Sequence, residues 1–156
     1  MIPELKTFLI AMSPIIELRG AIPVALKAYN LPLWKAYGLS VAGNLVPLWG
    51  IIFLGRPIAN FLSRECLFFK KFFDWLFFKI GKKANLLLGK MGCDLTVLIL
   101  TALPIPLVGG WTGAIASLIL EVPAKKGIWL VFFGTLISGI IVSLLSLGLI
   151  NFISGA

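Results

Sequence analysis

The chain has 156 residues, of which 60% are hydrophobic and 13% charged, and its net charge is +8. Its mean hydropathy of +1.05 excludes an ordinary soluble domain, because so short a chain has too little interior to bury this many apolar side chains. The composition therefore predicts one all-α integral membrane domain. Histidine, the usual general base and the commonest metal ligand, is missing from the sequence. We therefore expect no enzyme active site, no cofactor and no metal.

Three uncharged runs are long enough to cross a bilayer core of ~30 Å, which takes about 20 helical residues. They are Ala36–Leu54, Leu95–Leu120 and Gly127–Ala156. We expect clean spanning helices at Trp34–Leu54 and from about Gly127 to Ile153. Asn44 in the first of these helices either hydrogen-bonds to the backbone of a neighbouring loop or lines a substrate pathway.

The first segment, Ile2 to Tyr29, is apolar but contains the stretch SPIIELRGAIPV. Pro14, Gly20 and Pro23 interrupt a helix there, because an interior proline removes a helix hydrogen bond and clashes with the preceding turn. Broken backbone is stable in hydrocarbon only where protein buries it or where it lines a cavity. We therefore expect a re-entrant hairpin, which enters and leaves the membrane on one side.

Glu17 and Arg19 are the two charged residues inside this stretch. Side chains two positions apart do not face each other on a helix, but they project to the same side of an extended backbone. We therefore expect non-helical backbone between Pro14 and Pro23, with both side chains in one polar cavity. Burial favours a protonated Glu17 and Arg19 favours an ionised one, so an anionic substrate that draws Arg19 away should lead Glu17 to take up a proton. The alternative is a structural ion pair, or one that anchors the loop at the membrane surface.

The segment from Pro57 to Gly92 is interrupted by charges too often to span a membrane. Its apolar residues nevertheless recur at helical spacing; they are Phe61, Leu62, Phe68, Phe69, Phe72, Phe73, Leu76, Phe77 and Ile80. This pattern predicts an amphipathic interfacial helix that lies on an anionic leaflet. Eight of the fourteen basic residues lie between Arg56 and Lys90, which indicates lipid headgroups rather than nucleic acid as their partners.

A second broken segment, LPIPLVGGWTGA, follows at Leu103–Ala114. Its helix breakers are Pro104, Pro106, Gly109, Gly110 and Gly113. The segment predicts a second re-entrant hairpin, and the alternative is a kinked spanning helix. Trp111 and Thr112 at its tip either contact a ligand or pack against the facing loop, while the glycines permit close backbone approach. Asp94 opens the first arm and is favourable there as an N-cap; the alternative is a proton site.

The two broken segments belong to an internal repeat. Pro14 and Gly20 correspond to Pro104 and Gly110 at a shift of 90 residues, and Pro32 and Gly43 correspond to Pro123 and Gly134 at a shift of 91. The predicted organisation is a first half-repeat at 1–55, an amphipathic connector at 56–92 and a second half-repeat at 93–156. Paired broken segments in two halves of a chain indicate a transporter-like site near the membrane midplane.

The basic residues predict how these halves are oriented. If both hairpins are re-entrant, ten basic residues share one side, namely the eight of 56–90 and the pair Lys125–Lys126. Only Lys6, Lys27 and Lys35 lie on the other side. The positive-inside bias places the ten in the cytoplasm of an inner (plasma) membrane. The hairpins then enter from opposite faces as an inverted repeat, and two short hairpins with few spanning helices favour a homodimer that covers the broken backbone.

The stretch ELRGAIP (Glu17–Pro23), followed by LPIPLVGGWTGA, resembles the small multidrug export protein family over nearly the whole chain. That family looks like a branch of the DedA/VTT membrane superfamily. The resemblance implies two re-entrant loops that face each other, and a function such as lipid scrambling, undecaprenyl-phosphate translocation or proton-dependent transport. DedA relatives carry acidic and arginine residues at both loops, whereas the second loop here is uncharged. Only Glu17 and Arg19 therefore match the functional residues that the resemblance implies.

The function expected from these features is the translocation of lipids or small molecules. The candidate substrate-binding or proton-coupling residues are Glu17, Arg19, Asn44 and Asp94. The expected partners are membrane lipids with anionic headgroups and a second copy of the chain. The alternative is a non-transporting scaffold that supports envelope assembly by packing and lipid binding. An intramembrane enzyme is disfavoured, because no acid dyad and no activated nucleophile lies near Glu17.

Overall fold

The structure is a computed structural model that describes residues 2–65, 75, 78, 92–105 and 109–154. The secondary-structure elements among its described residues are helices, with no β-strand, which confirms the all-α prediction. The helices are α1 (Pro3–Met12), α2 (Glu17–Lys27), α3 (Leu33–Glu65), an apolar helix at Gly92–Ala102, α5 (Gly110–Ile119) and α6 (Ala124–Ser154).

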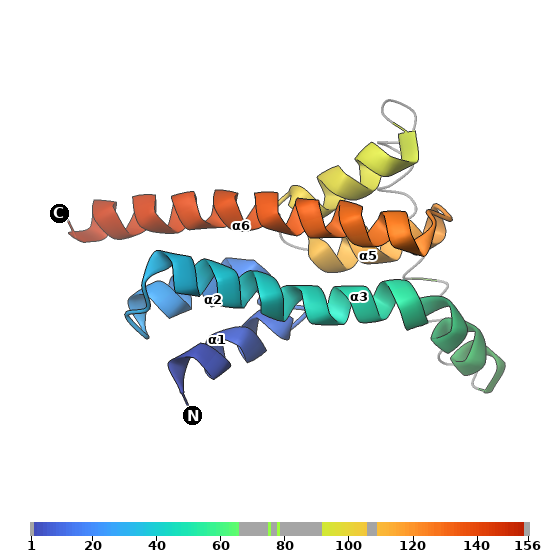
Figure 1. Cartoon of the computed structure of the whole chain (residues 1–156), viewed down its shortest axis with the longest axis horizontal. Coiled ribbons are helices and arrows are strands. Elements are labelled where there is room, and N and C mark those ends of the chain that lie inside the picture. Colours follow the sequence, from blue (N-terminus) through green and yellow to red (C-terminus); the bar gives the residue numbers. More distant parts are fainter. Residues whose placement is uncertain (1, 66–74, 76–77, 79–91, 106–108, 155–156) are drawn as a thin grey trace.

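Two of these helices are long and apolar enough to cross a membrane. The candidate spans are Leu33–Gly55 within α3 and Ala124–Ile150 within α6. At 1.5 Å per residue they are about 35 and 40 Å long, enough for a hydrocarbon core of ~30 Å. Both agree with the spans predicted from the sequence. The two helices pack against each other and run in opposite directions (Figure 1).

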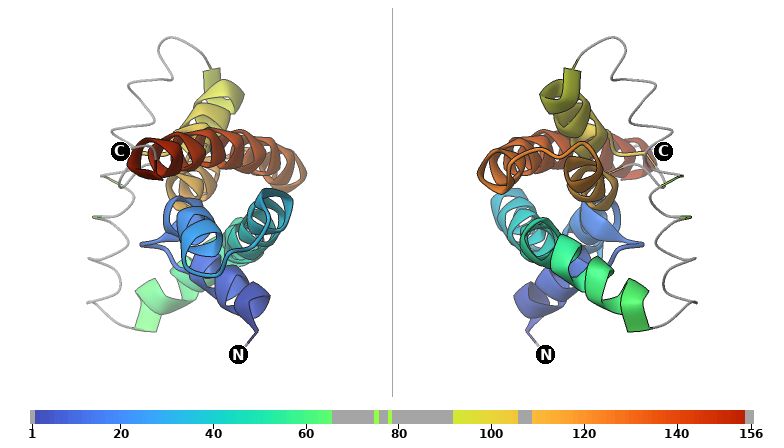
Figure 2. Two further views of the ribbon diagram at one scale, coloured as in Figure 1. Left: turned by 90° about the vertical axis from the view of Figure 1, so that its left-hand side faces the viewer. Right: turned by 90° about the vertical axis from the view of Figure 1, so that its right-hand side faces the viewer.

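The remaining described helices form two hairpins. The first hairpin consists of α1 and α2, and the chain reverses direction between them at residues 13–16. The second hairpin consists of the Gly92–Ala102 helix and α5, which run in opposite directions. In Figure 1 the first hairpin opens toward the end where α3 begins and the second toward the end where α6 begins, and their tips meet near the middle. Figure 2 shows α1 and the Gly92–Ala102 helix on opposite outer sides, with α2, α3, α5 and α6 between them.

The breaks in these hairpins are shorter than the sequence predicted. Pro14 lies in the first break, but Gly20 and Pro23 lie inside α2. The expectation of non-helical backbone up to Pro23 is therefore wrong. The reason is that tertiary packing overrides local preference, since four residues of α2 are at most 2% exposed. They are Leu18, Ala21, Ile22 and Ala25.

The second break shows the same difference. Pro104 precedes α5, whereas Gly110 and Gly113 lie within it and Pro106 lies outside the described residues. Gly113 packs against Thr101 of its own hairpin so closely that a Cβ would overlap the threonine side chain. These two glycines therefore allow helices to approach each other and do not form loop backbone.

The predicted interfacial helix at 56–92 lies largely outside the described residues. Its first residues continue α3 through Pro57 to Glu65, so the boundary placed after residue 55 is not the end of a helix. Trp75 and Phe78 are exposed. The remainder of that prediction stays untested.

The described residues form three buried clusters; one of them, Leu100 with Ala116, lies within the second hairpin, and the other two share α3 and α6. The first joins α2 to them through Leu18, Ile22, Val41, Leu45 and Val142. The second joins both arms of the second hairpin to them through Leu48, Ile52, Val97, Ala114 and Val131. Both hairpins therefore pack against the same pair of long helices, each at the end of the pair toward which that hairpin opens.

Contacts in the two halves correspond at the sequence shift of 90 to 91 residues. Gly43 and Gly134 each lie where an outer hairpin arm crosses a long helix, and a Cβ at either position would meet a backbone carbonyl and a Cβ of that arm. The contacted residues are Phe8 and Ala11 for Gly43, and Leu98 and Thr101 for Gly134. The two glycines, and the residues that they contact, therefore occupy corresponding positions in the two halves of the repeat.

Ion pairs and turns correspond in the same way. Lys35 lies 3.7 Å from Glu4, and Lys126 lies 2.6 Å from Asp94; each pair joins the first turns of an outer arm and of the following long helix. The turns before the two long helices each contain a non-glycine residue with positive φ, 49° at Asn30 and 55° at Glu121. Three different kinds of local structure thus recur at one spacing.

Candidate functional site

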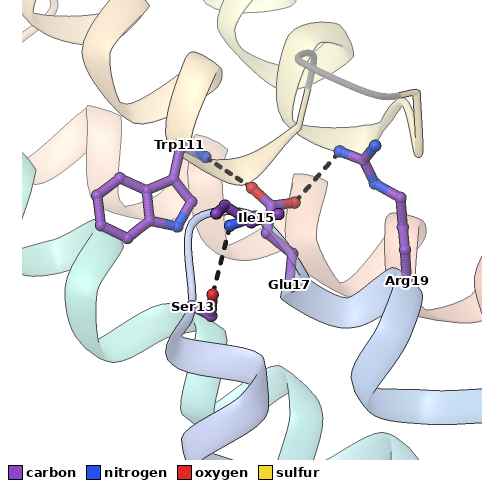
Figure 3. A network of polar contacts seen from close by, with 5 residues as sticks. All are labelled: Ser13, Ile15, Glu17, Arg19 and Trp111. Carbon is purple, nitrogen blue, oxygen red and sulfur yellow. Dashed lines mark hydrogen bonds and ion pairs between the residues drawn. The ribbon is translucent and has the colours of Figure 1, made fainter. Parts of the chain in front are cut away.

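Glu17 lies where the tips of the two hairpins meet (Figure 3). The backbone N–H of Trp111 donates a hydrogen bond to its carboxylate, with 3.5 Å between N and Oε1. Its other oxygen lies 3.4 Å from Nη2 of Arg19. Trp111 is the second residue of α5, and the free N–H groups at a helix N-terminus favour a negative charge. The carboxylate of Glu17, at the start of α2, therefore accepts a hydrogen bond from the N-terminus of α5.

The local backbone explains how Glu17 reaches both partners. Glu17 is only 7% exposed and has a φ of 48°, a left-handed conformation that costs an ordinary residue roughly 1–2 kcal/mol. Because this residue begins α2, its side chain leaves the backbone in a direction that a regular helical residue does not have. The pair with Arg19, two positions later, forms for this reason although α2 is helical from Glu17 onward.

The tip of the second hairpin has no space for side chains where it meets this pair. A Cβ at Gly109 would lie 2.7 Å from Glu17 Oε2 and 2.8 Å from Arg19 Nη2. A Cβ at Gly110 would lie 3.2 Å from Asn44 Nδ2 and 2.6 Å from a leucine methyl group of α3. The backbone of the second hairpin therefore fits between the charged pair on one side and α3 on the other.

Several buried polar atoms around the inner helices have no hydrogen-bond partner in the part of the chain that the structure describes. They are Ser40 Oγ, Asn44 Oδ1, Trp111 Nε1 and Ser143 Oγ. A buried polar group without a hydrogen-bond partner destabilises the fold by about 1–3 kcal/mol. A cluster of such groups therefore favours a place where a ligand supplies the missing partners. Asn44 was a candidate from the sequence. Ser40 was missed, although it precedes Asn44 by four positions and so shares its helix face.

The structure does not bring Asp94 to this site. Asp94 lies in the first turn of the Gly92–Ala102 helix, at the end away from the hairpin tip (Figure 1), and pairs there with Lys126. Both side chains are about half exposed, at 48% and 56%. Thr112 is buried in α5. The described residues contain no group of three or more acidic, cysteine or histidine side chains that could hold a metal ion.

Most of this chain matches the model of one protein family. The model of a family described as "putative small multi-drug export protein" matches residues 17–141. No curated protein and no solved structure matches the chain. The matched segment starts at Glu17 and contains both Gly109 and Trp111, so it includes the contact between the two hairpin tips. Together with the two apolar helices, the family name indicates a small membrane export or transport protein. Because the match covers most of its length, the chain belongs to the small multi-drug export protein family.

Proposed function

We propose that this protein translocates lipids or small molecules across a membrane, along a pathway between two opposed re-entrant hairpins. The observation that carries the proposal is the buried carboxylate of Glu17 at the contact between the two hairpin tips. Ionisable groups and broken helices are costly in hydrocarbon and are found where they line a pathway or a protein interior. Here a charge and two breaks coincide in one place.

The correspondence between the halves supports an inverted repeat. The hairpins open toward opposite ends of the molecule and the two long helices are antiparallel (Figure 1), while the glycine contacts and ion pairs recur at one spacing. In transporters built from inverted repeats, one half rocks against the other around a site near the midplane. The Glu17–Trp111 contact would lie at such a site.

The proposed orientation follows from the basic residues. Lys125 and Lys126 lie in the first turn of α6, at the end toward which the second hairpin opens (Figure 1). The positive-inside bias places that end in the cytoplasm of an inner membrane, together with the basic segment 56–92. The end with Lys6, Lys27 and Lys35 then faces outward.

Exchange of partners at Glu17 offers a coupling between anions and protons. Burial opposes the ionised carboxylate, whereas Arg19 and the N–H of Trp111 favour it. An anionic substrate that attracts Arg19 removes the largest favourable charge, and Glu17 then binds a proton more readily. A neutral substrate would leave the pair intact and would not be coupled in this way.

Reconstitution of the purified protein into vesicles tests the proposal. Two probes are followed across a range of pH: the exchange of a fluorescent phosphatidylglycerol between leaflets, and the flux of ethidium. The wild-type protein should accelerate one of them above the rate in protein-free vesicles. Glu17→Gln keeps the size and a hydrogen-bond acceptor but cannot ionise, so it should flatten the pH dependence. Glu4→Gln is the matched control, since Glu4 pairs with Lys35 away from the hairpin tips.

Two results would contradict the proposal. If neither probe moves faster than in protein-free vesicles at any pH, the chain is better described as a scaffold. If transport occurs but Glu17→Gln leaves its rate and pH profile unchanged, the pathway does not involve the contact between the hairpin tips.

A further inference from the structure

A cavity of about 370 Å³ lies between α2 and the C-terminal half of α6. Its lining residues are Arg19, Pro23, Lys27, Pro104, Val142, Leu145, Ser146, Leu149 and Ile150. We propose that this cavity binds a single-chain organic anion, with its headgroup at the cations of α2 and its apolar body along α6. Only the idea that such a ligand is subsequently moved rests on the function proposed above; the binding itself does not.

The cationic wall is formed by one face of α2. Arg19, Pro23 and Lys27 are spaced four residues apart, so they lie in a row along the helix. Arg19 and Lys27 are therefore about 12 Å apart along the axis, with Arg19 at the inner end near the hairpin tips and Lys27 at the end of α2. None of the described residues that line the cavity is acidic, and the Glu17 carboxylate pairs with Arg19 from outside this wall.

The facing wall is apolar apart from Ser146, whose hydroxyl donates a hydrogen bond to the backbone carbonyl of Val142 in its own helix. Val142, Leu145, Leu149 and Ile150 recur at helical spacing and form one face of α6 toward the cavity. Leu145 and Leu149 are 59% and 62% exposed, so this wall is open to the surroundings and available to a ligand. A positive row opposite an aliphatic row is complementary to a molecule that is anionic at one end and apolar along its length.

The size of the cavity narrows the ligand class. Small-molecule sites range over about 300–1,000 Å³, and this cavity is at the lower end of that range. Its volume matches one apolar chain with one headgroup, and a two-chain bilayer lipid would have to place its second chain outside the cavity. The headgroup class follows from Arg19, because a guanidinium binds carboxylate and phosphate groups through paired hydrogen bonds. A fatty-acid-like carboxylate is the simplest molecule that meets both conditions.

Binding at this cavity has a direct link to Glu17. Arg19 lines the cavity and also lies 3.4 Å from the Glu17 carboxylate. An anion that enters from the Lys27 end and reaches Arg19 would compete with Glu17 for the same guanidinium. The cavity would thus be the side entrance to the site at the hairpin tips.

Equilibrium dialysis provides the test. The wild-type protein in phosphatidylcholine nanodiscs is dialysed against labelled dodecanoate, with empty nanodiscs subtracted. We expect saturable binding, and we expect neither dodecanol nor dodecyltrimethylammonium to compete. Lys27→Gln, at an exposed position, should weaken binding about threefold, and Arg19→Gln should weaken it about tenfold. Leu145→Ala should weaken it about fivefold through lost apolar contact.

Lys125→Gln is the charge-matched control, because it removes one exposed cation at the other end of the molecule and should not change binding. Three results would overturn the proposal. They are the absence of saturable binding by the wild type, competition by dodecyltrimethylammonium as strong as that by unlabelled dodecanoate, and wild-type affinity for dodecanoate in both Lys27→Gln and Leu145→Ala. Equal competition by phosphatidylglycerol would overturn the single-chain assignment. If dodecanoate binds but no probe is translocated in vesicles, only the translocation proposal fails.

Discussion

The backbone of Gly109 lies directly against the Glu17 carboxylate, so that a Cβ at this glycine would be 2.7 Å from Glu17 Oε2. These residues come from different hairpins and are 92 positions apart in the numbering. Because the carboxylate lies so close to the backbone, a side chain at position 109 would displace it. The proposed site therefore depends on a missing side chain as much as on the charged ones.

Gly109→Ala should displace the Glu17 carboxylate from the tip of the second hairpin. The new methyl group would overlap only the flexible ends of the Glu17 and Arg19 side chains, which can move aside with little strain in the backbone. We expect a loss of the pH dependence of translocation and only a small change in the thermal unfolding temperature in detergent. Gly50→Ala is the matched control, since no atom lies within 4 Å of the added Cβ and alanine favours helix over glycine. Equal behaviour of the two variants would contradict the contact.

Gly43→Ala and Gly134→Ala should have similar effects on stability. Each added methyl group would overlap the outer hairpin arm that crosses its helix. For Gly43 the overlap is with Phe8, and for Gly134 it is with Leu98 and Thr101. We expect each to destabilise the fold by about 1–3 kcal/mol, measured by unfolding in mixed detergent micelles. Gly38→Ala serves as the control, because its surroundings are open. If only one of the two substitutions destabilises the protein, the halves are not equivalent in packing.

Asp94→Asn should leave the pH profile of translocation unchanged. Asp94 forms a half-exposed pair with Lys126, distant from the hairpin tips, so its loss should cost less than about 1 kcal/mol of unfolding free energy. Glu4→Gln should behave alike through its pair with Lys35. The pH dependence of vesicle translocation is the measurement. A profile shifted by Asp94→Asn would reinstate this carboxylate as a proton site.

Cysteine labelling should show that both flanks of each hairpin face the same side of the membrane. In the second hairpin the native Cys93, which is exposed, should react with an impermeant maleimide from the cytoplasmic side in a Cys66→Ser background. Glu121→Cys should react from the same side in a background in which Cys66 and Cys93 are both replaced by serine. Ile2→Cys and Asn30→Cys, with Cys93 also replaced by serine, should react from the other side. Labelling of Cys93 and Glu121→Cys from opposite sides would mean that the second segment crosses the membrane.

Trp111→Phe should be tolerated unless a ligand uses the indole nitrogen. Trp111 Nε1 is buried with no hydrogen-bond partner among the described residues, so removing this N–H removes a desolvation cost of about 1–3 kcal/mol and offsets part of the lost packing. We therefore expect a small change in thermal stability. If translocation falls sharply while stability does not, the indole N–H contacts the substrate. Unchanged translocation would assign Trp111 to packing alone.

The sequence by itself determined the class of this protein and its long elements. The spans at Leu33–Gly55 and Ala124–Ile150 could be predicted because the length of an apolar run is visible in the sequence, and about 20 such residues suffice for a spanning helix. The residue spacing that relates Gly43 to Gly134 was also readable, since proline and glycine positions are visible without coordinates. Glu17 and Arg19 could be selected because charge is costly in such a chain.

Only the tertiary structure decided how these residues meet. Pro23 and Gly20 were expected to break the backbone, yet burial of one face of α2 keeps both within a helix. The partner of Glu17 is the N-terminus of α5, which no local pattern specifies, because backbone N–H groups have no signature in the sequence. Likewise, Asp94 lies in the first turn of the Gly92–Ala102 helix, away from the hairpin tips, and pairs there with Lys126. Local preferences determine where a chain can turn, whereas long-range packing determines which turns come together.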